Sequence, residues 1–158
     1  PLRGWDALKR APKQGVMHQN HQQWRKNMES SVEGVFQITG WDESPYSESD
    51  DGSKQSHAKI TQEYTGAIEG SSNLQYLMSY QSESSAIFVG LEKIEGSFNG
   101  KAGSFMLQHN GKFENGVASS EFFVVPNSGK GELVAIDGSG SFKSGENGKA
   151  NYIAQFSA

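Results

Sequence analysis

Glu92 and His109 are the residues of this sequence whose types and positions best suit acid–base chemistry. His109 lies in GSFMLQHNGKF, residues 103–113, where apolar and polar side chains alternate as they do in a half-buried strand. A carboxylate among apolar groups and a neighbouring imidazole can exchange a proton near neutral pH, so such a pair can act as a general acid or base. The same two residues can instead form a hydrogen-bonded structural pair in the core.

Two Asn-Gly turns predict that these side chains share one face of a sheet. Asn-Gly is the strongest two-residue hairpin signal, and one copy at 99–100 separates two strand-like runs. The register of that hairpin makes Glu92 and His109 diagonal neighbours, with Cβ atoms about 7 Å apart. A second copy at 115–116 sets His109 opposite Phe122. The first turn therefore brings the acid and the imidazole within reach of one another, and the second adds Phe122 to the same face.

Apolar residues surround the pair on this face. Across three strands the face carries Phe88, Ile94, Phe105, Leu107, Phe122 and Val124. The opposite face mixes charged residues with Ile87, Val89, Leu91, Met106 and Phe123. This mixture leaves open which face points inward. If the second face points outward, its apolar residues predict packing against a subunit partner, and a homo-oligomer is one expectation.

Polarity alternates with period two from residue 32 onward, so these two hairpins belong to a longer series of strands. Runs of this kind predict eight strands, as in an antiparallel barrel or sandwich, near 32–41, 58–69, 73–81, 85–96, 102–114, 116–126, 131–142 and 149–157. Asn110-Gly111 lies inside a run, and a β-bulge, which would slip the second pairing by one residue, is the preferred interpretation. The alternative is a turn, which would change the register beyond it. The polar segment 42–57 is expected to be a mobile loop.

Composition bounds the function. The chain has 158 residues, a net charge of −4 and no cysteine, which suits one domain of residues 32–158 behind an extension over 1–31. The scattered charge argues against nucleic-acid binding, and no apolar run is long enough to span a membrane as a helix.

The sequence has neither metal-ligand clusters nor cofactor motifs, so no metal and no cofactor are expected. Cytoplasm is the expected location, since no signal-peptide pattern begins the chain.

Four stretches resemble an uncharacterised bacterial family with an allene-oxide-cyclase-like β-barrel: GWDESPY (40–46), LQYLMSY (74–80), residues 88–113 and VVPNSGKGEL (124–133). The resemblance implies an all-β, eight-stranded antiparallel barrel with a central cavity. Proteins of the wider barrel class hold hydrophobic substrates and guide their cyclisation or isomerisation. Three further site candidates match the family's motifs: Trp41, Glu43 and Tyr80.

The favoured hypothesis is a barrel that binds a small apolar molecule in its cavity. Cofactor-free isomerase or cyclase activity on that molecule is an additional hypothesis. Glu92 would be the acid or base, and His109 would tune it. Phe88, Phe105, Leu107 and Phe122 would shape the ligand. The alternative is a non-catalytic structural or oligomerising barrel whose interior is packed shut. The sequence leaves open whether the protein is an enzyme.

Overall fold

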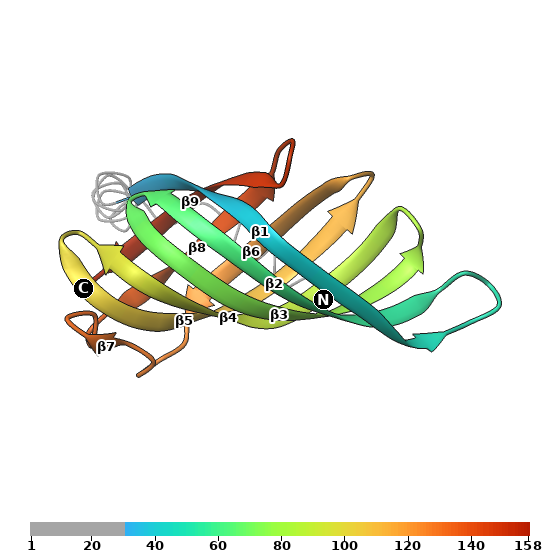
Figure 1. Cartoon of the computed structure of the whole chain (residues 1–158), viewed down its shortest axis with the longest axis horizontal. Coiled ribbons are helices and arrows are strands. Elements are labelled where there is room, and N and C mark those ends of the chain that lie inside the picture. Colours follow the sequence, from blue (N-terminus) through green and yellow to red (C-terminus); the bar gives the residue numbers. More distant parts are fainter. Residues whose placement is uncertain (1–30) are drawn as a thin grey trace, which may run out of the picture. The chain divides into compact units, whose positions relative to one another are not determined.

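A computed structural model describes residues 31–158, and all of their regular elements are β-strands (Figure 1). Apart from Ser31, the expected extension over 1–31 lies outside the described residues. The strands are β1 (Ser31–Glu48), β2 (Lys54–Gly66), β3 (Ile68–Ser82), β4 (Ser85–Phe98), β5 (Lys101–Glu114), β6 (Val117–Val124), β7 (Lys130–Gly131), β8 (Asp137–Ser144) and β9 (Lys149–Ser157).

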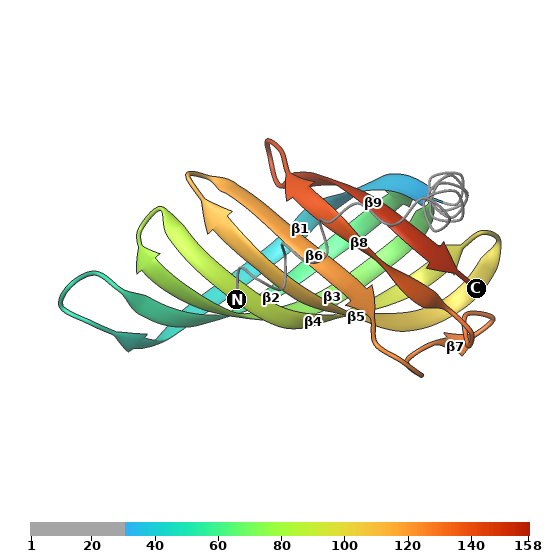
Figure 2. The same ribbon diagram turned by 180° about the vertical axis from the view of Figure 1, so that it is seen from behind.

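Eight of these strands form a closed antiparallel barrel. Hydrogen-bonded neighbours run β4-β3-β2-β1-β9-β8-β6-β5, and the pairing of β4 with β5 closes the ring. The two-residue strand β7 pairs with β5 outside this ring. Figures 1 and 2 show the long, tilted strands from both sides. The predicted eight-stranded antiparallel barrel is confirmed.

The face that carries Glu92 and His109 points inward. Its apolar members Phe88, Ile94, Phe105, Leu107, Phe122 and Val124 are all buried. The opposite face points outward, and it leaves large apolar side chains exposed: Ile87, Val89, Leu91 and Phe123. The alternation predicted from the sequence therefore separates interior from exterior, although the exterior keeps an apolar patch.

The two ends of the barrel differ. The connection between β6 and β8 folds back over one end and buries Leu133 and Ile136. At the opposite end lie the tips of the β1–β2, β3–β4, β5–β6 and β8–β9 hairpins, and the β1–β2 hairpin projects farthest (Figure 1). We call this second end the open end.

Both predicted Asn-Gly hairpins are confirmed. Asn99 and Asn115 have positive φ values of 53° and 51°, as a tight turn between antiparallel strands requires. The registers agree as well, since Phe98 pairs with Lys101 and His109 pairs with Phe122.

The predicted bulge at Asn110-Gly111 is wrong. β5 pairs with both neighbours without a register shift, and Gly111 keeps extended backbone within β5. Glycine is required there for space: the ring of Phe88, its direct partner on β4, occupies the position that a Cβ would take. A close contact between strands, not a positive φ, explains this glycine.

Two predicted boundaries are also wrong. The expected loop 42–57 is mostly strand, because β1 and β2 continue as a paired ribbon that turns only at 49–53. Ribbon pairing satisfies its backbone even though most of its side chains are polar. The expected strand 131–142 is interrupted: Gly131 ends the short strand β7, residues 132–136 form the connection that covers the end of the barrel, and strand resumes in β8 at 137.

Candidate functional site

Glu92 and His109 form a buried ion pair or hydrogen bond inside the barrel. Nε2 of His109 lies 2.7 Å from Oε1 of Glu92, and the two side chains are 2% and 1% exposed. The hydroxyl of Tyr64 donates to the other carboxylate oxygen, Oε2, over 2.5 Å. Both oxygens of the carboxylate therefore have a partner.

Ser120 fixes the orientation of the imidazole. Its hydroxyl donates its only proton to the carbonyl oxygen of Glu121 at 3.0 Å, so Oγ is left to accept from Nδ1 of His109 at 3.1 Å. With Nδ1 as a donor, one proton remains to be shared between Nε2 and Oε1 of Glu92. Carboxylate with imidazolium, or carboxylic acid with imidazole, gives the same zero net charge.

Aromatic rings enclose this network. The rings of Tyr76, Phe122 and Phe142 lie 5.6, 5.4 and 5.7 Å from the ring of His109, measured between centroids. Burial, together with the nearby charge of Glu92, raises the pKa of Tyr64 well above its ordinary value, and that of Tyr76 likewise. The Tyr64 hydroxyl therefore stays protonated and remains a donor over the physiological range.

A small apolar cavity lies nearer the open end. Its volume is about 80 Å³, and Glu92 and His109 are not part of its wall. Tyr76 and Phe142 line the cavity and also touch His109, so the buried pair lies one ring behind the wall. The other lining residues are Phe36, Ile38, Trp41, Ile60, Gln62, Met78, Phe88, Phe113, Ala118, Ser144, Gly148, Lys149 and Ala150.

A second carboxylate, Glu43, lies on the inner face of the β1–β2 ribbon beside the cavity. Its Oε1 accepts from the indole N–H of Trp41 at 3.0 Å, and its Oε2 accepts from the hydroxyl of Ser56 at 2.5 Å. Burial alone would raise the pKa of Glu43. The hydrogen bonds and the charge of Lys54 outweigh that effect, so the pKa is lowered and the group stays anionic.

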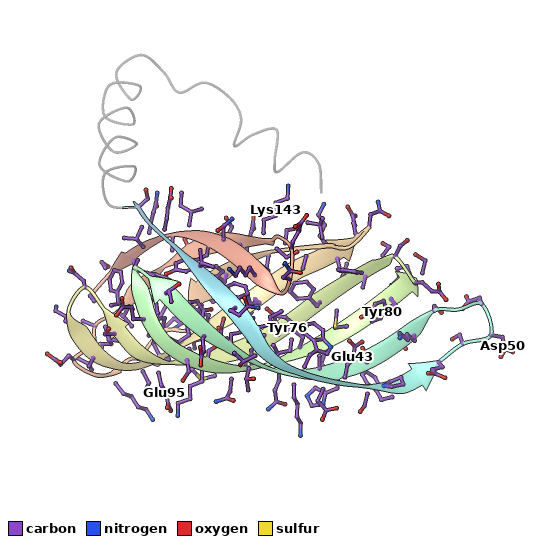
Figure 3. The ribbon with its side chains drawn as sticks, turned by 45° about the horizontal axis from the view of Figure 1, so that its top comes forward. Glu43, Asp50, Tyr76, Tyr80, Glu95 and Lys143 are labelled. Atoms are coloured by element: carbon purple, nitrogen blue, oxygen red, sulfur yellow. The ribbon has the colours of Figure 1, made fainter. Side chains whose placement is uncertain are left out.

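Tyr80 joins this rim from β3. Figure 3 shows Tyr80 and Glu43 directed toward one another, whereas Glu95 points away from the barrel and Asp50 lies at the tip of the ribbon. Burial and the carboxylate of Glu43 raise the pKa of Tyr80 to about 12. The ammonium of Lys54 lies 4.7 Å from the centroid of the Tyr80 ring, in a cation–π contact. A carboxylate, an ammonium and two aromatic side chains thus converge at the rim.

Comparison with known proteins identifies the family of this chain and a solved structure that is similar to it. The model of a protein family of unknown function, DUF3224, matches residues 32–156. The chain belongs to this family. A crystal structure of a protein with unknown function from the DUF3224 family, from Shewanella oneidensis MR-1, is similar to this chain. The identity is 29% and the TM-score is 0.65, over 80% of this chain and 95% of that one. A search of curated proteins found no match. The predicted resemblance to an uncharacterised family is confirmed.

The structure brings the candidate residues of this DUF3224 protein into three places. Trp41 and Phe88 line the cavity, and Glu43 and Tyr80 lie at its rim. Glu92 and His109 form the buried pair, with Phe122 against the imidazole. Phe105 and Leu107 are each 1% exposed and pack deeper, outside the cavity wall. Whether any of these residues binds a ligand stays a prediction.

Sequence reasoning missed the partners that come from β2. Tyr64 and Gln62 alternate with buried Ile60 on the inner face, so the period-two pattern of β2 could have placed them there. Their contacts could not have been derived in the same way. Tyr64 reaches Glu92 across the interior from a strand that is not the neighbour of β4.

Two kinds of feature are absent from the part of the chain that the structure describes. Among residues 31–158, no group of three or more His, Asp or Glu side chains is arranged to hold a metal ion. The same residues include no helix of the length and apolarity needed to cross a membrane. His18 and His21 are close enough in the sequence to suggest a metal site but are short of further ligands, and both lie outside the described residues.

Proposed function

We propose that this DUF3224 protein binds a small apolar molecule in the cavity at its open end. The observation that carries this proposal is the cavity itself, about 80 Å³ in volume and walled almost entirely by aromatic and aliphatic side chains. Apolar walls with a few convergent polar groups are typical of small-molecule sites. An unfilled apolar void also lowers stability, so occupying it is favourable.

The position of Trp41 supports entry from the open end. Its side chain lines the cavity yet is 47% exposed, and its indole N–H is held by Glu43. A ring that is anchored by one edge and about half exposed can contact an entering ligand with little loss of side-chain entropy. The opposite end is covered by Leu133 and Ile136, which are buried.

The volume limits what the cavity holds. At about 30 Å³ for a water molecule, 80 Å³ corresponds to roughly three waters, well below the usual size of a ligand pocket. The cavity therefore takes one end of a molecule, or a very small molecule. A longer ligand would continue past Trp41 along the inner face of the β1–β2 ribbon.

Binding without turnover fits this geometry better than isomerase or cyclase activity. Glu92 and His109 would have to act through Tyr76 and Phe142, whose rings stand between the pair and the cavity. A general acid or base works within hydrogen-bond reach of the substrate. The network around Glu92 has the satisfied partners of a structural core pair.

A packed structural barrel is the second candidate, and one observation favours it. Deeper than the cavity, the interior is filled by side chains with 1% exposure or less, such as Leu74, Ile94 and Phe105. The test is retention of a compound from a metabolite extract, read by native mass spectrometry. Ala118→Phe, which fills the cavity wall, should abolish retention, and Val134→Phe on the exposed surface should not.

Retention by the unmodified chain and by Val134→Phe, with loss in Ala118→Phe, supports the binding proposal. If no compound is retained, or if Ala118→Phe retains it equally, the cavity is not a binding site. The packed-barrel candidate would then be preferred.

A further inference from the structure

We infer that the molecule held in the cavity carries a neutral hydroxyl group that donates a hydrogen bond to Oε1 of Gln62. This inference rests on the proposed function and names the chemical class of its ligand: an apolar alcohol or phenol that enters hydroxyl end first.

Gln62 is the polar exception in an apolar wall. It lies in β2, lines the cavity and is 4% exposed. Among the described residues, no group donates a hydrogen bond to its Oε1. Buried side-chain oxygens without a partner are rare in folded proteins, and each calls for an explanation. A ligand donor at this atom is such an explanation.

A second unpartnered oxygen lies beside it. Ser72 on β3 is the direct register partner of Gln62, is 3% exposed, and its Oγ also has no partner within residues 31–158. Ser72 is not part of the cavity wall. The two side chains mark one polar spot on the inner face, of which only Gln62 faces the cavity.

The chemistry of the spot selects a hydroxyl. An amide oxygen needs a donor, which excludes hydrocarbons, ethers and simple ketones. A charged ammonium would lie among lining residues that include no carboxylate, at a large desolvation cost. A hydroxyl is neutral, donates to the amide oxygen and can also accept from the amide nitrogen. It therefore satisfies either orientation of the Gln62 side chain.

Water is the competing occupant. A buried water typically makes about three hydrogen bonds, and two is the usual minimum. The cavity offers mostly aromatic and aliphatic walls, with Gln62 the one polar side chain whose oxygen there is buried and unpartnered among the described residues. An apolar alcohol uses both features at once, because its hydroxyl meets Gln62 and its hydrocarbon part fills the remaining volume.

The experiment compares three probes of one shape: 4-methylphenol, para-xylene and 4-methylanisole. Para-xylene replaces the hydroxyl by a methyl group, and the anisole offers only an acceptor. Binding is followed by the methyl NMR signals of Ile38, Ile60 and Met78 in the wall, with Ile87 and Leu91 on the outer surface as internal controls. The same titrations are repeated with Gln62→Met, and with Gln62→Leu in case the first variant folds poorly.

For each protein we compare the affinity for 4-methylphenol with the affinity for para-xylene. We expect this ratio to be at least about tenfold higher in the unmodified chain than in the Gln62 variants, because a buried acceptor gains its partner. The anisole should show no such preference. If all three probes bind alike and the variants leave the ratio unchanged, the hydroxyl inference is overturned while the binding proposal stands. If no probe moves the wall signals, the binding proposal itself fails, and this inference fails with it.

Discussion

The hydroxyl of Tyr64 and the carboxylate of Glu92 meet across the interior of the barrel, 2.5 Å apart, from strands that are not neighbours in the sheet. The bond ties β2 to β4 without passing through β3. Because Nε2 of His109 on β5 lies 2.7 Å from the other carboxylate oxygen, three strands converge on one acidic side chain. The network therefore helps to position Tyr76 and Phe142, the rings that contact His109 on one side and line the cavity on the other.

Tyr64→Phe removes one donor and leaves Oε2 of Glu92 buried without a partner. An unsatisfied buried acceptor costs about 1–3 kcal/mol, so the free energy of unfolding should fall by that amount. Urea unfolding at pH 7 measures it. Tyr46→Phe makes the same change at a side chain that is 61% exposed and serves as the control. Equal stability of the two variants would contradict the assigned hydrogen bond.

Glu92→Gln should be tolerated, whereas His109→Leu should not. In Glu92→Gln the amide oxygen can accept from Tyr64 and the amide nitrogen can donate to Nε2 of a neutral His109, so every group keeps a partner. We expect a loss of less than about 1 kcal/mol for Glu92→Gln. His109→Leu leaves the acid of Glu92 buried without its imidazole, at about 3–5 kcal/mol.

Urea unfolding of both variants checks this contrast. A loss on Glu92→Gln as large as that on His109→Leu would show that the carboxylate, and not its neutral replacement, is required. That result would show that an ionised pair, and not a neutral hydrogen-bonded network, stabilises the barrel.

Stability should fall at alkaline pH because folding raises the pKa of the partly buried Tyr80. Tyr80 titrates at about 12 in the folded protein and at its ordinary value of about 10 when unfolded. Between these values the folded state holds the proton that the unfolded state has lost, so stability is complete below pH 10 and declines as pH rises toward 12. Unfolding midpoints in urea at pH 9 and at pH 11 measure the decline.

Tyr80→Phe should make that decline smaller, since the variant has no phenol to titrate at the rim. Tyr46→Phe is again the control, and its decline should match that of the unmodified chain. A steeper decline in Tyr80→Phe would contradict the raised pKa.

Gly111→Ala should destabilise the barrel by overpacking. The added methyl group would meet the ring of Phe88 and the backbone oxygen of Ser119, and overpacked cores lose about 1–3 kcal/mol. Gly145→Ala is the matched control, because its Cβ would meet only the backbone oxygen of Lys149, at 3.7 Å. In the Phe88→Leu background the cost of Gly111→Ala should shrink, as a double-mutant cycle from thermal unfolding would show.

The parts of the structure that were predictable from the sequence are local. Asn99-Gly100 and Asn115-Gly116 fix their turns within four residues, and the register then follows along each pair of strands. This is why the contact between Glu92 and His109 could be expected. The inward direction of that face could not, because apolar residues such as Val89 and Leu91 also lie on the outer face.

Features that depend on distant segments could not be predicted. The sequence around Gly111 suggests a bulge, and only the contact with Phe88 in the folded barrel explains this glycine. Leu133 fits a strand pattern in the sequence, but it is buried because the connection that carries it covers the end of the barrel. The ribbon of β1 and β2 lacks an apolar signal over much of its length, because pairing with each other rather than burial holds it. Ring closure decides which residues line the cavity, and ring closure is not a local property.

The seam between β1 and β9 has a consequence for how the domain folds. These strands are neighbours in the sheet, although β1 ends at residue 48 and β9 begins at residue 149. The hairpins can form early from contacts close in sequence. The seam closes later, because bringing β1 and β9 together costs the conformational entropy of the long segment between them. Until then β1 and β9 each present an unpaired backbone edge, which is a template for association with other chains. The slow step of folding and the main risk of aggregation thus fall at the same place, the junction of the first and last strands described.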